Sequence, residues 1–398
     1  MSDPFEHLTF LSLEQATILP YLSWRFAQEG VRVIRIEHPT QCDPNRRIGS
    51  PYREGEDLMC DYILAGNAGK EAITLNLKDP RARRLLGELL VRLDVDIFAA
   101  NTLPKHMKAL GVGYEELSAV KKDLIWVGLT GFGPDSDEPA YDPILQARGG
   151  IMDMTGEAEG EPQLAGVYLP DIGTAKDAYG EIMKALYRRA VTGRGSRIDV
   201  SMLQATASWL LQPITMCKSF GRVMHRRGNN HPFFVPSGVF PTSDGWLYIA
   251  IGIDLQWGRL LEIAGFEELD RAGWAANRGR AQDRDHVLQA VAACTGRYAT
   301  DALLGRLHAH SVPAGKCNDV TGVCEDPFVA PHLVRSCEEA TGFEVIMSPP
   351  PVTSEWLRRH DMTMSFPPRL GEHNERIFMG DLGISEAEYL TLRADGVI

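Results

Sequence analysis

A single carboxylate, Asp171, follows Pro170 in the stretch YLPDIGTAKDAYG, just ahead of a segment whose apolar residues recur at helical spacing. An aspartate at a helix start can cap the helix, because its oxygens accept hydrogen bonds from the free backbone N–H groups of the first turn. Thr174 competes for that position, since Thr174 and Asp177 resemble a capping box in which Asp replaces the usual Glu. Asp171 would then stand one turn before the helix without a structural task. The residues alone leave both interpretations open, a helix cap and a carboxylate kept for chemistry.

The chain lacks the short motifs of several common enzyme classes. It contains no GxxxxGK[ST] phosphate loop and no strand followed by GxGxxG; Gly131 and Gly133 lack the third glycine and indicate a turn. It has no GxSxG nucleophile elbow, so an α/β-hydrolase has no support. No HExxH motif or Cys/His set has zinc-ligand spacing, and we therefore predict that the protein binds no metal.

The composition is that of an ordinary globular protein with room for two domains. The 398 residues exceed the size of about 250 to 300 residues at which a single core stops growing. Apolar residues make up 44% of the chain and charged residues 24%, which argues against disorder. The net charge of −12 argues against nonspecific binding to nucleic acid or to an anionic membrane, because both depend on surplus Lys and Arg. An anionic ligand would need a local basic site.

We expect a soluble, cytoplasmic protein. The N-terminal sequence MSDPFEHLTF lacks the basic and apolar regions of a secretory signal, and no apolar run approaches the roughly 20 residues that span a bilayer. The seven cysteines are scattered, odd in number and form no CxxC pair, which is typical of reduced thiols.

Strands and helices alternate along the first half of the chain. The pattern predicts strands at 8–14, 31–37, 72–78, 95–100 and 124–133, with helices at 17–30, 79–94 and 114–120 between them. A further helix is expected over 174–191, ending at the glycines of TGRGS, and a strand at 198–203 leads into another helix. Strands that alternate with helices of this length form parallel βαβ units with helices on both faces. We therefore predict an α/β fold with an open, Rossmann-like parallel sheet.

The character of the chain changes after the helix that follows this last strand. The stretch 225–325 opens with Gly, Pro and Asn, then predicts strands around a turn at 243–245, followed by two helices. We expect a smaller α/β domain here. The tail that follows begins irregular and proline-rich, and its SPPPV segment suits an extended linker.

Nine segments spread over nearly the whole chain resemble the class III CoA-transferase family, which includes formyl-CoA transferase, carnitine CoA-transferase and α-methylacyl-CoA racemase. They are VRVIRIEHP, NAGKEAITLNLK, AANTLPKHMKALGV, GLTGFGP, YDPILQARGG, DIGTAKDAYG with TGRGSRIDVSM, GNNHP, DGWLYIAIGIDLQW and PRLGEHNERI. Nine segments in the expected order are hard to explain by chance.

The resemblance implies a role for Asp171, because the acid aligned with it is the covalent nucleophile of the family. In that mechanism the carboxylate attacks an acyl-CoA thioester to give a mixed anhydride and CoA thiolate, the thiolate forms an aspartyl-CoA thioester, and an acceptor acid then takes the CoA. A helix N-terminus beside Asp171 would keep it ionised and supply N–H groups to an oxyanion. The family pattern also makes Gln15 a hydrogen-bond donor to the acyl carbonyl and Asp142 a second active-site acid. Alternatively, Gln15 is a polar helix-start residue and Asp142 a turn residue before Pro143.

For coenzyme A, the family positions correspond to Ala16, His38, Lys70, Asn101 and Leu110. The resemblance implies that Lys70 pairs with a phosphate and that His38 contacts the adenine or the ribose phosphate. His38 stands where the family frequently has Arg, and a neutral His would weaken that phosphate contact. Each of the two basic residues is equally explained as a solvated surface charge.

The resemblance further implies two ring-shaped protomers that interlock as a homodimer. In that fold the N- and C-terminal segments join in the large domain, and linkers hold the small domain. The corresponding division is 1–208 for the N-terminal part of the large Rossmann-like domain, 209–224 for a linker, 225–325 for the small α/β domain, and 326–398 for a linker and the C-terminal part of the large domain. The interlock is implied by the resemblance alone.

Among the activities of the family, CoA transfer to a free acid fits the residues best. The racemases have a His directly before the acid at position 142 and a Glu in the small domain, whereas this chain has Tyr141 and Asp254. It therefore lacks a base suited to removing an α-proton near neutral pH. A subunit of a heteromeric CoA-transferase is the second alternative, against which Asp171 argues.

The substrates are less constrained than the reaction. The segment GNNHPFFVPSGVF lacks the glycine run that formyl-CoA transferases fold over the nucleophile, which disfavours formyl and oxalate substrates. A basic cluster of Arg222, His225, Arg226 and Arg227 either holds a distal carboxylate or forms a charged linker surface. On this ground we expect succinyl-CoA as the donor and a dicarboxylic or branched acid as the acceptor, with carnitine-like acceptors as an alternative.

Overall fold

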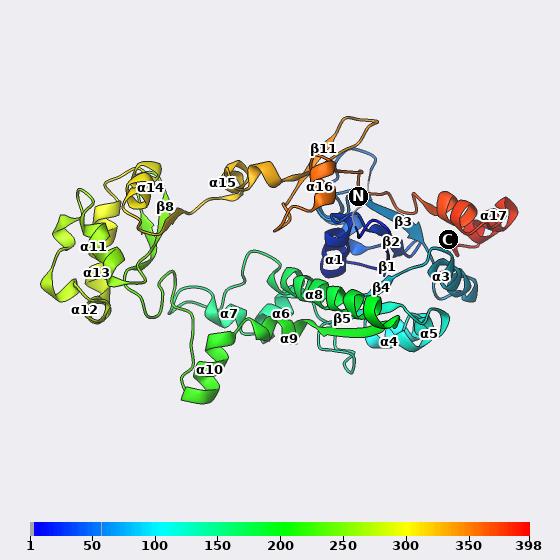
Figure 1. The fold of residues 1–398 in the computed structure, drawn as a ribbon, viewed down its shortest axis with the longest axis horizontal. Helices are drawn as coiled ribbons and strands as arrows, with labels where there is room; N and C mark the ends of the chain where they lie inside the picture. The colour runs from blue at the N-terminus through cyan, green and yellow to red at the C-terminus, as the bar shows by residue number, and fades with distance from the viewer. Residues whose placement is uncertain (1–3, 57) are drawn as a thin grey trace. The chain divides into compact units, whose positions relative to one another are not determined.

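The computed structural model describes residues 4–56 and 58–398, which form two compact units (Figure 1). The large unit comprises the described residues up to Gly150, together with Ala165–Thr215 and Pro327–Ile398. The small unit comprises Ile151–Leu164 and Met216–Asp326. Each unit is therefore assembled from segments that are separated in the sequence.

A six-stranded parallel sheet lies at the centre of the large unit. Its strands stand in the order β3 (Lys70–Thr74), β2 (Arg32–Glu37), β1 (Thr9–Leu13), β4 (Ile97–Ala100), β5 (Ile125–Thr130) and β6 (Ser196–Ser201). Every neighbouring pair is parallel, and Leu11 of β1 lies opposite Ile34 on one side and Phe98 on the other. The strand order reverses between β1 and β4, where sheets of this type leave a ligand crevice at the carboxyl ends of the strands.

Helices cover both faces of the sheet, because alternate strand residues point to opposite sides. Phe10 and Val33 pack on the first face, and Leu11 and Ile34 on the second. The first face carries α1 (Ile18–Ala27) and α8 (Leu169–Thr192), which Figure 1 shows side by side; the second carries α3 (Pro80–Arg92), α4 (Pro104–Leu110), α5 (Tyr114–Val120) and α17 (Glu386–Ala394). The predicted α/β fold with a parallel sheet is confirmed.

The remaining elements of the large unit are short. They are η1 (Pro44–Arg46), α2 (Asp61–Leu64), α6 (Asp142–Arg148), α9 (Met202–Ser208), η4 (Ala330–His332), α16 (Glu355–Arg359), η5 (Arg376–Asp381) and a second sheet in the order β11 (Glu344–Met347), β10 (Val334–Cys337) and β12 (Thr363–Met364). The C-terminal segment is fastened to β3, since the backbone N–H groups of Ala72 and Thr74 donate to the side chains of His373 and Asn374.

The small unit has a sheet and a core of its own. Its antiparallel strands are β7 (Ser237–Pro241), β8 (Trp246–Ala250) and β9 (Ala314–Lys316). Its helices are α7 (Ile151–Met154), α11 (Asp254–Leu261), η2 (Glu267–Leu269), η3 (Ala272–Trp274), α12 (Asn277–Gln282), α13 (Arg284–Thr295), α14 (Thr300–Ala309) and α15 (Val320–Glu325). Leu247, Trp257 and Val291 are among its fully buried side chains.

Two segments differ from the division made on the sequence. The expected linker at 209–224 contains helix α10 (Leu211–Phe220), and residues 151–164, assigned to the large domain, pack with the small unit. The second segment is polar and glycine-rich without periodicity. Its place is fixed by contacts distant in sequence, such as the ion pair of Asp153 with Arg226.

Candidate active site

Helix α8 begins at Leu169, and its first turn contains Pro170 and Asp171. Pro suits this position because the first N–H groups of a helix have no partner within it. The residue before the helix, Tyr168, makes no side-chain capping bond, and the buried Thr174 hydroxyl has no hydrogen-bond partner among the described residues. The predicted helix start at 174 and its capping box are therefore wrong, and Asp171 lies inside the first turn.

A second carboxylate, Asp142, lies against the start of α8. The backbone N–H of Asp171 donates to Asp142 Oδ2 at 3.1 Å, and Gln146 Nε2 donates to Asp142 Oδ1 at 2.6 Å. Gln146 also holds the segment leading into α8, since it donates to Val167 O at 3.2 Å and accepts the Ala165 N–H at 3.0 Å. Asp142 is 4% and Asp171 9% exposed. The structure thus brings two of the predicted site residues together, both largely removed from water.

Burial and the neighbouring carboxylate make Asp171 hard to ionise. Burial raises its pKa, repulsion from Asp142 adds to the effect, and the pKa of Asp171 reaches about 7. No cation among the described residues offsets these two effects. Burial also raises the pKa of Asp142, against the hydrogen bonds from the Asp171 N–H and the Gln146 amide. Both effects on Asp171 oppose the ionisation that the helix N-terminus was expected to favour.

Tyr168 lies near the carboxylate pair and is bonded to a second tyrosine, Tyr62. The hydroxyls of Tyr168 and Tyr62 lie 2.7 Å apart, which ties the start of α8 to α2. The hydrogen bond with Tyr62, burial and the charges of Asp142 and Asp171 together raise the pKa of Tyr168 to about 12. Tyr168 is therefore a neutral hydroxyl near the carboxylates at any physiological pH.

Sequence reasoning did not select Gln146, Tyr62 or Tyr168. Gln146 follows Asp142 by four residues, a spacing that places both on one face of a helix, so this pair was open to prediction. Tyr62 lies 106 residues from Tyr168, and no local pattern connects them.

A cavity of about 140 Å³ opens at the carboxyl ends of β1, β2 and β4, at the reversal of strand order. Four predicted site residues line it, namely Gln15, His38, Asn101 and Leu110. Ala16 follows Gln15 directly, and the Asn101 side-chain amide is hydrogen-bonded to the Gln15 backbone. Nucleotide-containing ligands bind at this position in sheets of this order.

His38 lies in the cavity wall as a neutral ring. Its Nδ1 accepts the backbone N–H groups of Thr40 at 3.2 Å and Gln41 at 3.1 Å. Burial lowers the pKa of His38, and the charge of Lys78 acts in the same direction, against a hydrogen bond with Asn76. A neutral His38 offers no charge to a phosphate, so the weakened contact expected where the family has Arg stays a prediction.

Lys70 is not among the residues that line the cavity, and it is 2% exposed. Its Nζ donates to Glu14 Oε1 at 2.9 Å, Pro20 O at 2.8 Å and Asn67 Oδ1 at 2.8 Å. Burial lowers the pKa of Lys70 to about 8, against the attraction of the Glu14 carboxylate. All three N–H groups are occupied, so Lys70 has no free donor for the phosphate contact expected of it.

Two residues of the basic cluster in the small unit are bonded to neighbouring residues of the same unit. Arg226 pairs with Asp153 at 3.2 Å and donates Nε to Gly160 O at 2.8 Å, and His225 Nδ1 lies 2.8 Å from Asp153 Oδ2. The side chains of Arg226 and His225 are therefore engaged within the protein and give no support to the expected binding of a distal carboxylate by this cluster. They hold the segment 151–164 instead.

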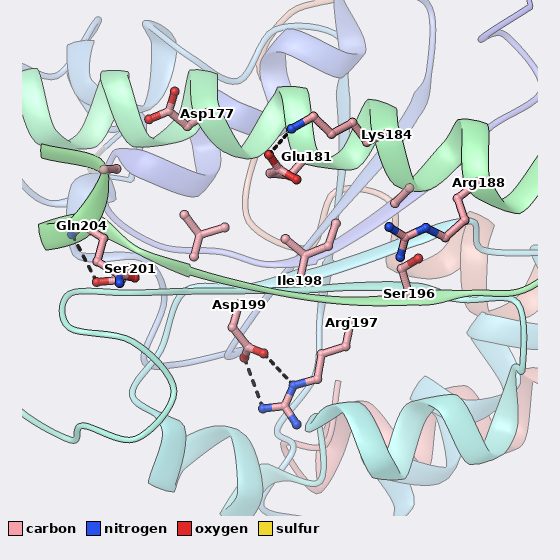
Figure 2. Close-up of a pocket in the computed structure, with 13 residues that line it drawn as sticks. Asp177, Glu181, Lys184, Arg188, Ser196, Arg197, Ile198, Asp199, Ser201 and Gln204 are labelled. Atoms are coloured by element: carbon pink, nitrogen blue, oxygen red, sulfur yellow. Dashed lines mark hydrogen bonds and ion pairs between the residues drawn. The ribbon is translucent and has the colours of Figure 1, made fainter. Parts of the chain in front are cut away.

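A larger groove of about 450 Å³ lies between α8 and the edge strand β6 (Figure 2). Figure 2 shows Lys184 and Glu181 paired on the helix and Arg197 and Asp199 paired on the strand, with closest contacts of 2.5 and 2.7 Å. None of the predicted site residues lines this groove. Its size alone does not mark it as the active site.

The fold and the site define an α/β protein of the Rossmann type, with a ligand crevice and a buried carboxylate pair in the same unit. The model of CoA-transferase family III matches residues 6–374. Over 385 residues the chain is 32% identical to a succinate–glutarate CoA-transferase of Agrobacterium fabrum, covering 94% of each protein. Over 340 residues it is 33% identical to an acetyl-CoA:oxalate CoA-transferase of Acetobacter aceti, covering 84% of this chain and 86% of that protein. The crystal structure of a CaiB/BaiF family protein from Brucella suis has a TM-score of 0.83 and 29% identity, covering 96% of this chain and 100% of that one.

The chain belongs to CoA-transferase family III. The predicted family and the predicted transferase class are confirmed. In residues 4–56 and 58–398, no three His, Cys, Asp or Glu side chains are grouped so that they could hold a metal ion. Over the same ranges, no helix has the length and apolar character needed to cross a membrane.

Proposed function

We propose that this chain transfers CoA from an acyl-CoA to a free carboxylic acid through covalent intermediates on Asp171. The observation that carries the proposal is the Asp171 carboxyl, which is buried in the first turn of α8 with no cation among the described residues to offset its burial. A buried acid kept for structure is normally paired or hydrogen-bonded, because an isolated buried charge is costly. A strongly shifted pKa without such a partner is typical of a functional group.

The proposed reaction exchanges one acyl bond for another without hydrolysis. The Asp171 oxygen bonds to the thioester carbonyl carbon, the C–S bond breaks, and CoA leaves as thiolate. The thiolate then bonds to the Asp171 carboxyl carbon, the donor acid leaves, and CoA remains on the aspartate as a thioester. The acceptor carboxylate attacks this thioester and releases thiolate, which attacks the acceptor carbonyl of the new anhydride and frees Asp171. Splitting the transfer in this way replaces one difficult step by easier ones.

The two neighbours of the nucleophile have different proposed roles. Asp142 is a positioning residue that holds the Asp171 backbone N–H and, through repulsion, raises the basicity of the Asp171 carboxylate. Gln15, which lines the cavity, donates a side-chain hydrogen bond to the acyl carbonyl as charge develops on the carbonyl oxygen. CoA binds in the crevice lined by His38, Asn101 and Leu110.

The proposed substrates are succinyl-CoA as donor and a dicarboxylic acid as acceptor. The two relatives described above are named for glutarate and oxalate as acids, both of which carry two carboxylates. Because one of these relatives is named for oxalate, this acid belongs in the test set even though the glycine run of formyl-CoA transferases is absent.

Racemisation is the less favoured alternative. Asp254, at the position where racemases have a Glu base, accepts a hydrogen bond from buried Arg280 at 2.7 Å and another from the Asn277 N–H at 2.7 Å. The hydrogen bond from Arg280 holds the pKa of Asp254 below its usual range, against a smaller effect of burial. An ion-paired carboxylate of low pKa is a poor base for an α-proton.

The test is a screen of free acids with succinyl-CoA and acetyl-CoA as donors, with the new CoA esters identified by mass. We expect a dicarboxylate such as glutarate to become its CoA ester with the wild-type chain and not with Asp171→Asn. Wild-type chain that transfers CoA to no acid from either donor, or equal transfer by the variant, would contradict the proposal.

A further inference from the structure

Side chains from outside the loop between β1 and α1 hold its backbone. Asn101 accepts the Gln15 N–H at Oδ1, 3.1 Å away, and donates Nδ2 to Gln15 O at 2.7 Å. Asp43 Oδ1 accepts the Ala16 N–H at 3.0 Å, and Asn45 Nδ2 donates to Ala16 O at 2.8 Å. All four backbone polar groups of these two residues are thus fixed by side chains that follow β2 and β4.

Ala16 needs this support because its backbone is left-handed, with φ +59°. A residue with a Cβ loses about 1 to 2 kcal/mol in this region relative to its ordinary conformations. Such a conformation persists only where surrounding bonds over-determine it, and residues of this kind cluster at binding and catalytic sites.

Asp43 is itself anchored by a buried ion network. Arg35 Nη2 lies 3.0 Å from Asp43 Oδ2, and Arg35 Nε lies 3.1 Å from Glu37 Oε1. Arg46 bonds the same Glu37 carboxylate at 2.7 Å. The side chains of Arg35 and Asp43 are fully buried, so the acceptor for the Ala16 N–H cannot shift without breaking an ion pair in a low-dielectric environment.

The loop between β1 and α1 forms one wall of the cavity at the reversal of strand order. Gln15 and Asn101 line that cavity, and so does Asp43. The side chains that fix the loop therefore also fix the shape of the space in which CoA is proposed to bind. Asn101, which is proposed to contact CoA, also holds the Gln15 backbone through its amide.

We propose that Asn45, together with Asp43, is a positioning residue for CoA binding, holding Ala16 left-handed so that Gln15 stands in the cavity wall. This inference rests on the proposed function, since it concerns the same CoA site. Neither residue was selected from the sequence, because each acts on the backbone of a residue 27 or more positions away.

The test compares Asn45→Ala, Ala16→Gly and the double variant with wild type. Affinity for CoA is measured by isothermal titration, amide exchange of the peptide containing residues 15 and 16 by mass spectrometry, and kcat and KM with an acyl-CoA donor. We expect Asn45→Ala to speed exchange and weaken CoA binding about tenfold, as for one lost hydrogen bond at a strained turn, with KM rising more than kcat falls. Adding Ala16→Gly should restore most of the affinity, because glycine adopts the left-handed region without penalty.

Asn374→Ala is the matched control. Its side-chain amide also bonds backbone at the end of a strand of the same sheet, accepting the Thr74 N–H at 2.8 Å and donating to Thr74 Oγ1 at 2.7 Å, outside the cavity. We expect it to keep wild-type affinity for CoA. If Asn45→Ala fails to fold, Asn45→Asp replaces it, since the carboxylate keeps the shape but cannot donate to Ala16 O.

The outcomes separate the two proposals. Wild-type chain that does not bind CoA would overturn both the proposed function and this inference. Wild-type chain that binds CoA while Asn45→Ala binds it equally, or while Asn374→Ala loses as much, would overturn the inference alone. Failure of Ala16→Gly to restore binding in the Asn45→Ala background would also overturn it, because the effect would then not pass through the Ala16 conformation.

Discussion

At the scale of single residues, the ionised form of Asp171 destabilises the folded chain. Its pKa is raised from 3.8 to about 7 on folding, so between these pH values the unfolded chain releases a proton that the folded chain keeps, and stability falls as pH rises. We predict that the free energy of unfolding of Asp171→Asn exceeds that of wild type at pH 8 by an amount on the order of a few kcal/mol, so that the variant unfolds at a higher temperature. This difference should shrink toward pH 4. Thermal unfolding of both proteins across this range measures it. A difference that grows toward acid pH would contradict the raised pKa.

The same group sets the expected pH dependence of the reaction. If ionised Asp171 is the nucleophile, the transfer rate should rise with pH through about 7 and then level off.

Asp142→Asn removes the charge that repels ionised Asp171, so the rising part of the pH–rate profile should move to lower pH. The plateau rate should fall about tenfold, because the charged acceptor for the Asp171 N–H is lost. The pair titrates as a coupled system, and pH–rate profiles of the two proteins report its apparent pKa values. An unmoved limb in Asp142→Asn would show that another group controls the rate.

The residue types of the carboxylate pair were visible in the sequence, but their contacts were not. Asp171 and Asp142 were both selected, through the resemblance to a family. The backbone hydrogen bond between them spans 29 residues, and no local periodicity reports such a contact. Lys70 shows another limit of sequence reasoning. The sequence does not reveal that all three N–H groups of this lysine donate to acceptors inside the protein.

At the scale of elements, the first turn of α8 depends on a glycine. A Cβ on Gly173 would lie 2.0 Å from Trp209 Cζ2, so we predict that Gly173→Ala lowers stability by about 1 to 3 kcal/mol and reduces transfer by displacing the turn that holds Asp171. Trp209→Ala in the same chain should recover part of both losses. Chemical denaturation and steady-state rates measure them.

Gly180→Ala is the control within the same helix. A Cβ there meets no atom of this chain within 4 Å, so alanine should stabilise α8 by about 0.5 to 1 kcal/mol through its higher helix propensity. Equal behaviour of the two alanine variants would show that the Trp209 contact has no influence.

Most sheet strands and their helices followed from the sequence, because alternating buried strands and amphipathic helices have distinct periods. The start of α8 did not. Pro170 in the first turn is itself a helix-start signal, but the apparent capping box at Thr174 was given more weight. Helix α10 was missed. None of its residues is buried in this chain, so no buried apolar face indicated a helix.

At the scale of the whole molecule, we predict a homodimer with an apparent mass near twice 44.0 kDa by light scattering, also at nanomolar concentration. The prediction comes from the family to which the chain belongs. It is supported by α10, none of whose residues is buried while Leu211 is 80% and Phe220 66% exposed, since apolar surface of this kind is normally covered. Ready exchange of subunits between labelled and unlabelled native protein would contradict an interlocked dimer. Transfer that requires a second, different chain would favour the heteromeric alternative.

The covalent intermediate on Asp171 tests the central claim most directly. Wild-type chain incubated with its acyl-CoA donor and no acceptor should gain the mass of CoA less one water on the peptide containing YLPDIGTAK, because the aspartyl thioester accumulates when nothing consumes it. Borohydride should reduce that thioester and leave an alcohol at residue 171. Asp171→Asn should give no adduct and lose transfer by several orders of magnitude, on the scale expected for a removed nucleophile. An Asp171→Asn chain that is fully active without an adduct would contradict the mechanism.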